Sequence, residues 1–300
     1  MLYPKSGHLA ALAKVTELPV LPAVLVRLMA LDDDSPELFD EVLDLAGKDP
    51  NLAVRILQLA NSADSAPENP IETLPTAIAR IGAAHLTSLI TAMSVVKVFV
   101  PHTEGQFELW SHSVEVATIA QLIAAKSNDR ALDPSRAYLC GLLHDIGRFV
   151  LFDDSPDELG KIEDRGWETP DELIAAERAV SGFDHTELGE LVCRHWRMSE
   201  LITTVVHKHH RNVALTSSSN VTDRMCVVVR IADRAAVLRH SHDWAVAAPA
   251  TQFKLLEEAC LEPHWTHSLA TTQTLMATLP VADAGVKQAM QMLALGHVHR

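Results

Sequence analysis

The sequence predicts an all-α protein built as a two-lobe helical bundle. Ala and Leu are abundant, whereas aromatic residues make up only 5% of the 300 residues, a balance that suits packed helices better than sheets. Start signals of Ser or Asp followed by Pro recur along the chain, and apolar side chains repeat between them at intervals of three and four residues. The hydrophobic content of 48% is sufficient for a large core.

The first hundred residues read as a helical lobe. Ser35-Pro36 and Asp49-Pro50 each pair a capping side chain with a proline at the first helical position. We expect helices at about 23–31, 36–46, 50–60, 75–81 and 83–99. The 77–89 segment has the look of a DNA-reading helix-turn-helix, but only Arg80 and His85 could contact phosphate, so we reject that interpretation.

The central part, 101–240, reads as a second helical domain after a break at 101–105. A long helix is expected at 107–125, and another from Asp133-Pro134 to about residue 146, with Gly147 as its stop. Residues 153–170 read as an acidic, exposed excursion, followed by a helix at 171–180. Asp184 to Glu187 resembles a capping box, and Ser199 and Thr222 are expected to cap the next two helices, the second running to about residue 239.

Residues 241–300 read as a C-terminal helical extension. Its helices are less well marked, at roughly 249–260, 267–277 and 283–295.

Composition excludes several classes of function. The net charge of −14 disfavours binding to nucleic acid or to an anionic membrane. The four cysteines are far apart without a Cys-x-x-Cys pair, so we expect reduced thiols in a cytoplasmic protein rather than disulfides or a zinc ribbon. We find no signal peptide and no apolar stretch long enough to span a bilayer.

The most informative stretch is 139–148, which places His144 and Asp145 side by side in an apolar run. Burying a carboxylate and an imidazole together is costly unless something compensates, and a divalent metal does so directly. The plainer interpretation is a buried histidine that its neighbour's carboxylate orients. The dipeptide alone does not separate the two.

Further ligand types fall on inward-facing positions of other expected helices. Glu108 and His112 share one helix face, and Asp233 lies on an otherwise apolar face. Five helices together contribute eight candidate metal ligands: Glu108, His112, His144, Asp145, His185, His209, His210 and Asp233. Such a set without thiolate suits iron, manganese, zinc or nickel, and its paired carboxylates allow one or two ions.

These residues and their surroundings resemble the HD superfamily, and within it the HDOD domains, the HD-related output domains of bacterial signalling proteins. The matching motifs are Leu18-Pro19 with Leu21-Pro22, Asp49-Pro50, Leu59-Ala60-Asn61-Ser62, Ala77-Ile78, Ile81-Gly82, Leu109 to Ser113, Gly141 to Arg148, Asp184 to Gly189 and His209-His210, with Asp233 as the terminal HD-type aspartate. The resemblance implies a two-lobe all-helical fold with an HD-type five-helix core. It also implies a bacterial regulatory setting.

The resemblance leaves two functions open. Related HD-GYP proteins hydrolyse cyclic di-GMP at a metal centre whose ligands fall on the eight residues above. Here Arg148 stands where those enzymes have a lysine, and no Asp-Gly-x-Gly-Tyr-Pro follows His210. We therefore favour a signal-transduction output module that binds a signalling protein or a nucleotide. The alternative is a metal-dependent phosphohydrolase or phosphodiesterase acting on a nucleotide or cyclic dinucleotide, with Asp145 and Arg148 as catalytic residues. The oligomeric state is not predicted.

Overall fold

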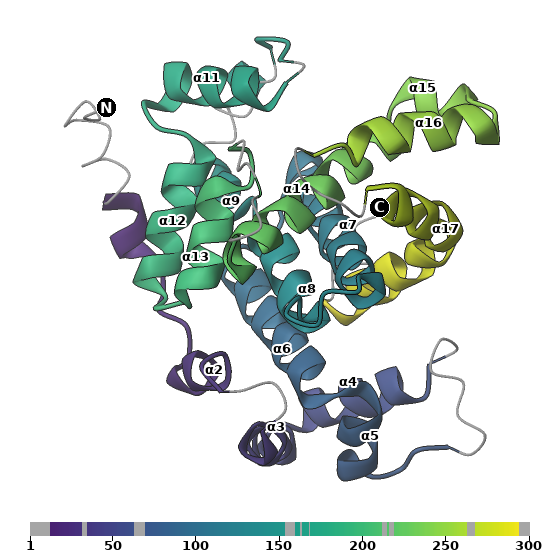
Figure 1. Cartoon of the computed structure of the whole chain (residues 1–300). Coiled ribbons are helices and arrows are strands. Elements are labelled where there is room, and N and C mark those ends of the chain that lie inside the picture. Colours follow the sequence, from purple (N-terminus) through teal and green to yellow (C-terminus); the bar gives the residue numbers. More distant parts are fainter. Residues whose placement is uncertain are drawn as a thin grey trace. The chain divides into compact units, whose positions relative to one another are not determined.

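The computed structural model describes residues 13–31, 35–62, 70–153, 160–162, 164–167, 169–211, 215, 219–262 and 268–293. Every regular element within these ranges is a helix, which confirms the all-α prediction. The chain forms two compact units, one of residues 21–97 and one of residues 1–20 together with 98–300 (Figure 1). Residues 241–300, predicted as an extension, therefore belong to the same unit as the central helices.

The unit of residues 21–97 contains the helices predicted for the first lobe. They are α2 (Ala23–Leu28), α3 (Pro36–Lys48), α4 (Pro50–Ala60), α5 (Leu74–Ile81) and α6 (Ala83–Val98), which reaches the unit boundary. Both predicted caps are confirmed: the Ser35 side chain accepts a hydrogen bond from the Leu38 amide, and Asp49 accepts two, from Asn51 and Leu52. Val42, Ile56 and Ile78 are fully buried in its core.

The larger unit is organised around α7 (Glu104–Lys126). Against α7 pack α8 (Pro134–Leu143), α14 (Val221–Arg239) and α17 (Ser268–Met292). A Cβ on Gly141 would lie 2.7 Å from the Cα of Ala117, so the glycine lets α8 approach the α7 backbone. Trp110 of α7 is fully buried and donates its Nε1–H to the Phe99 carbonyl at 3.1 Å.

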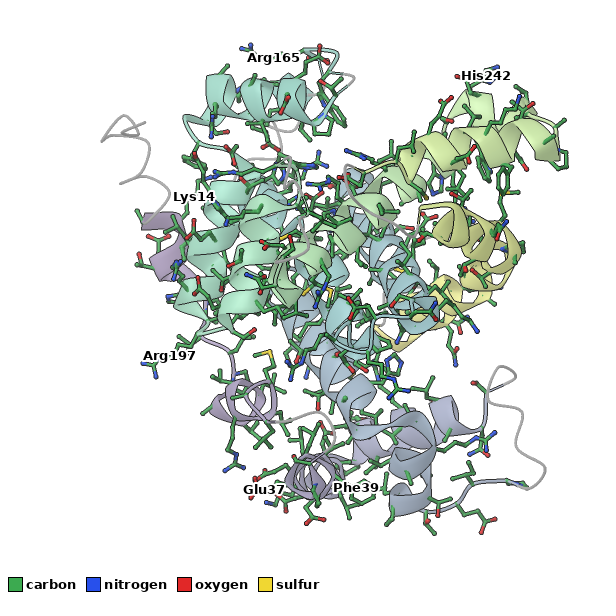
Figure 2. The ribbon with its side chains drawn as sticks, in the orientation of Figure 1. Lys14, Glu37, Phe39, Arg165, Arg197 and His242 are labelled. Carbon is green, nitrogen blue, oxygen red and sulfur yellow. The ribbon has the colours of Figure 1, made fainter. Side chains whose placement is uncertain are left out.

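A second group of helices completes this unit. It comprises α9 (Ile146–Asp153), α12 (His185–His195) and α13 (Glu200–Lys208), with α12 packed against both others. The predicted capping box at Asp184 and Glu187 and the Ser199 cap are confirmed. At the turn between α12 and α13, Arg197 adopts a left-handed φ of 55° and points away from the helices (Figure 2). The structure also describes α11 (Pro170–Ser181), α15 (His242–Val246) and α16 (Pro249–Ala259), and helical residues at 13–17 and 160–162.

Three predictions about helix ends are wrong. Gly147 lies inside α9 and ends nothing, because α8 already stops at Leu143. Asn220, rather than Thr222, caps α14 by accepting from the Asp223 amide. The helices predicted at 267–277 and 283–295 form the single helix α17, which runs through Pro280 because it packs along α7.

In the described part of the chain, no helix by itself is long and apolar enough to cross a bilayer; α5 and α6 reach that threshold only as a pair bent by 96°.

Candidate metal centre

The break between α8 and α9 carries His144 and Asp145. His144 keeps a right-handed helical backbone, with φ −53° and ψ −39°, so the chain turns there without a glycine. Both side chains are buried, with 0% of His144 and 4% of Asp145 exposed. The break therefore directs both groups into the interior of the larger unit.

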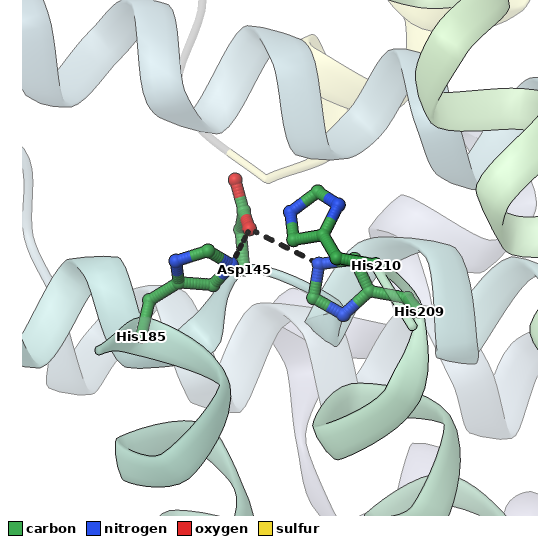
Figure 3. A group of neighbouring side chains, drawn as sticks. All are labelled: Asp145, His185, His209 and His210. Atoms are coloured by element: carbon green, nitrogen blue, oxygen red, sulfur yellow. Dashed lines mark ion pairs between the residues drawn. The ribbon is translucent and has the colours of Figure 1, made fainter. Parts of the chain in front are cut away.

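Asp145 lies at the centre of a first group of four residues, completed by His185, His209 and His210 (Figure 3). One ligand atom from each lies within 4.8 Å of the others. Asp145 Oδ1 is 3.4 Å from His185 Nε2 and 3.7 Å from His209 Nε2. The N-terminus of α12 supplies His185, and the residues directly after α13 supply the other two histidines.

A second group consists of His112, His144 and Asp233, from α7, the α8–α9 break and α14. Asp233 Oδ1 is 3.1 Å from His112 Nε2 and 3.9 Å from His144 Nε2. The other oxygen of Asp145, Oδ2, lies 3.6 Å from His144 Nε2. Asp145 therefore faces both groups, with one carboxylate oxygen toward each.

Three of the histidines are held with Nε2 free to bind an ion. The Nδ1 atoms of His144 and His209 lie 2.7 and 2.8 Å from the Gly141 and Val206 carbonyl oxygens, and only a protonated Nδ1 can donate to a carbonyl. The Nδ1 of His185 is bonded in the same way to the Glu177 carboxylate at 2.6 Å. When it is neutral, each of these three rings presents a lone pair at Nε2, as metal-binding histidines do.

The inner ends of these side chains have no hydrogen-bond partner among the described residues. This holds for four buried atoms: Nε2 of His144, His185 and His209, and Oδ1 of Asp145. Unpaired buried polar atoms are costly, and convergent ones are rare. A cation is the species that would satisfy three nitrogen lone pairs and a carboxylate at once, so the residues fit a divalent metal.

The histidines of the two groups differ in the direction in which their surroundings shift the pKa. Burial lowers the pKa of His144 to about 4 and that of His210 well below its usual range, so both are neutral at pH 7. Burial also opposes the charge on His185, but the Glu177 and Asp145 carboxylates outweigh it and raise its pKa to about 9. The surrounding imidazoles outweigh burial at Asp145 and Asp233 and keep the pKa of both carboxyl groups low.

The structure brings seven of the eight predicted ligands into these two groups and leaves Glu108 outside both. Glu108 is exposed one turn before His112 on α7. Side chains on a helix lean toward its N-terminus, so Glu108 leans away from the centre that His112 borders. Arg148, the second predicted catalytic residue, lies with its Nη1 atom 3.5 Å from Asp145 Oδ2.

Sequence reasoning missed Glu177, which is fully buried on α11 and bonded to His185. A signal was available, because Glu177 follows Leu173 by four residues on the buried stripe of its helix. An acid on an apolar stripe is the same signal that singled out Asp233.

The helical fold and this arrangement of histidines and aspartates define a protein of the HD class. The HDOD domain family matches residues 18–212, and the chain belongs to that family. An uncharacterized protein from Treponema pallidum is 23% identical over 197 residues, which are 66% of this chain and 38% of the relative. The chain thus spans well under half the length of that protein.

Solved structures share the fold. An HDOD domain protein of unknown function from Geobacter sulfurreducens is 24% identical with a TM-score of 0.69, covering 93% of this chain and 98% of its own. A protein from Shewanella amazonensis, described as a candidate phosphohydrolase, is also 24% identical, with a TM-score of 0.66 over 96% of this chain and 98% of its own. At these identities the likeness concerns the fold.

Proposed function

We propose that this chain is a metal-binding output module of bacterial signal transduction, located in the cytoplasm. The observation that carries the proposal is the convergence of three buried Nε2 atoms on the Asp145 carboxylate, none of which has a hydrogen-bond partner in the described part of the chain. The four cysteines are free and buried, as suits a reducing compartment.

The centre would hold one or two divalent ions. Asp145, His185, His209 and His210 would bind the first, and His112, His144 and Asp233 the second, with Asp145 shared. Imidazole and carboxylate ligands without thiolate suit iron, manganese, zinc or nickel. Bound there, such an ion would supply Lewis acidity or, in a regulatory module, a rigid link between helices.

Burial favours the regulatory role over catalysis. The side chains of the first group are at most 8% exposed, whereas a catalytic centre keeps a position open to its substrate. The module would act by binding a signalling protein or a nucleotide, with the metal fixing the relative positions of α8, α12, α13 and α14.

Arg148 supports the alternative, a metal-dependent phosphohydrolase acting on a nucleotide or cyclic dinucleotide. The site holds three carboxylates, of Asp145, Glu177 and Asp233, against the Arg148 guanidinium. With neutral imidazoles this leaves two negative charges, so two divalent ions would leave an excess of positive charge that attracts phosphate. Arg148 and His112 have side chains 12% and 22% exposed, so this side of the centre is the more open one.

Elemental analysis of the freshly purified full chain tests the proposal, followed by assays with cyclic di-GMP, cyclic AMP and a generic phosphodiester. We expect bound transition metal that Asp145→Ala removes and that Asp44→Ala, a change of an exposed aspartate on α3, leaves in place. Metal without turnover supports the output module, and turnover that Asp145→Ala abolishes supports the phosphohydrolase. A wild-type protein that takes up no transition metal overturns both.

A further inference from the structure

Helix α11 reaches the metal centre through one side chain. Its N-terminus is fixed by a capping box between Thr169 and Glu172, and Leu173 and Ala176 cover its inner face. Glu177 then extends from the same face and is 0% exposed. A buried carboxylate requires strong partners, and those of Glu177 belong to the centre.

One oxygen of Glu177 holds His185 at two points. Oε2 accepts from the His185 backbone amide at 2.9 Å and lies 2.6 Å from its Nδ1. The first bond fixes the start of α12, and the second fixes the rotation of the ring. Together they direct the His185 Nε2 atom toward Asp145, which is 3.4 Å away.

The other oxygen faces the opposite side of the centre. Glu177 Oε1 makes no hydrogen bond within the described residues and lies 3.8 Å from Nε of Arg148. Arg148 in turn contacts Asp145 Oδ2 at 3.5 Å. Glu177 therefore lies between a metal ligand and the guanidinium that neighbours the shared carboxylate.

We propose that Glu177 is a positioning residue of the metal centre and that, through it, metal binding stabilises the docking of α11 on the larger unit. The proposal rests on the metal binding proposed above. Carboxylates that accept from the outer nitrogen of a ligand histidine orient the ring and increase its basicity, and their loss weakens metal binding by about 10–100-fold. Because linkage is reciprocal, an ion that gains affinity from docked Glu177 must favour the docked helix by the same factor.

The neighbouring residue offers a matched control. Arg178 also connects α11 to the start of α12, through ion pairs to Asp184 at 2.6 Å and to Glu187 at 2.7 Å. It contacts none of the proposed metal ligands. Its side chain is 49% exposed, so its loss should cost little docking free energy. A variant without Arg178 therefore loses part of the attachment of α11 but keeps the contact that positions His185.

The affinity for Zn²⁺ tests the proposal. It is measured against a chromophoric chelator with the full chain at pH 9, where protons compete less for His185 than at neutral pH. Glu177→Gln keeps the shape of the side chain and should weaken binding about 10–100-fold, whereas Arg178→Ala should change it by less than about threefold. Equal affinity of Glu177→Gln and wild type overturns the inference and leaves the metal site standing. A wild type that binds no Zn²⁺ overturns the proposed function itself.

Hydrogen exchange on the wild-type protein decides the matter even if Glu177→Gln does not fold. Saturating Zn²⁺ should slow amide exchange in α11, 170–181, more than in α16, which belongs to the same unit but contributes no ligand. Equal slowing of both helices would indicate global stabilisation alone and contradict the coupling.

Discussion

A Cβ on Gly147 would lie 2.0 Å from the carbonyl oxygen of His185. The Gly189 amide nitrogen would be 2.7 Å away, so α9 meets α12 backbone to backbone over this residue. Asp145 precedes Gly147 by two positions, and the close approach accounts for its carboxylate lying 3.4 Å from the His185 ring nitrogen. The two ligands are thus placed together by a residue that contributes no side chain.

Gly147→Ala should therefore destabilise the protein by about 3 kcal/mol and weaken metal binding, because the clashing atoms are backbone and cannot rotate away. Gly47→Ala is the matched control. A Cβ at Gly47 on α3 would meet nothing within 4 Å, so the free energy of unfolding should be unchanged or rise by up to about 1 kcal/mol. Urea unfolding of both variants measures the difference, and similar values for the two would contradict the role of the close contact.

Gly147 also shows which features of the fold could not be predicted from the sequence. A glycine after an apolar run predicts a helix end, but the role of Gly147 depends on α12, which begins at His185, 38 residues further along the chain. Ser35, Asp49, Asp133 and Asp184 were predicted correctly because a cap is a contact within four residues. The break predicted between residues 277 and 283 is wrong for the opposite reason: the packing of α17 on α7 carries the helix through Pro280.

Among the candidate ligands too, some could be recognised from local sequence patterns and others depend on how the helices pack. His144, His209 and Asp233 were visible because each is a polar side chain on an apolar stripe. Glu108 shared that spacing with His112, but which of two residues on one helix face reaches the centre depends on how deep the helix is buried there.

Asp233→Asn should remove metal from one group only. Asp233 contacts His112 and His144, while Asp145 serves both groups. If the native protein holds two ions per chain, the Asn variant should retain about one and Asp145→Ala about none, because a neutral amide is a far weaker ligand than a carboxylate. Metal content per chain by elemental analysis is the measurement, and an Asp233→Asn protein with the full complement would show that the second group holds no ion.

Without metal, the protein should be most stable near pH 6.5. His185 has a folded-state pKa of about 9, above its unfolded value, so its stabilisation is complete below pH 6.5 and is lost as the pH rises to 9, on the order of 3 kcal/mol. His144, with a pKa of about 4, destabilises the fold as the pH falls from 6.5 toward 4. The charged and titratable groups facing His185 are Glu177, Asp145, Arg148, His209 and His210.

Urea unfolding of chelator-treated protein across pH 5–9 measures this profile. Glu177→Gln should reduce the loss of unfolding free energy between pH 6.5 and pH 9, the alkaline limb of the profile, since it removes the carboxylate that raises the pKa of His185. Saturating Zn²⁺ should reverse that limb, because the ion binds only the deprotonated Nε2. A Glu177→Gln protein with an unchanged alkaline limb would show that another group titrates there.

Glu262 should prove essential for stability although it lies outside the metal centre. Arg230 of α14 is only 3% exposed and donates to both Glu262 oxygens, at 2.6 and 2.7 Å, while its remaining nitrogen donates to the carbonyl of Arg211, directly after His209 and His210. Glu262→Gln removes the charge that compensates a buried guanidinium, a loss that costs about 3–5 kcal/mol in buried pairs.

Exposed Glu258 of α16 is the control, because Glu258→Gln should change the free energy of unfolding by no more than about 0.5 kcal/mol. The double variant Arg230→Met with Glu262→Leu should recover much of the stability, since it removes the buried guanidinium together with its counter-charge. Arg234, which also pairs with Glu262 at 2.8 Å, is 41% exposed and would be solvated by water. It should not recover metal affinity in full, because the Arg211 carbonyl loses its donor and the two histidines before it lose a support. Recovery of stability and affinity together would show that Arg230 does not support the metal ligands.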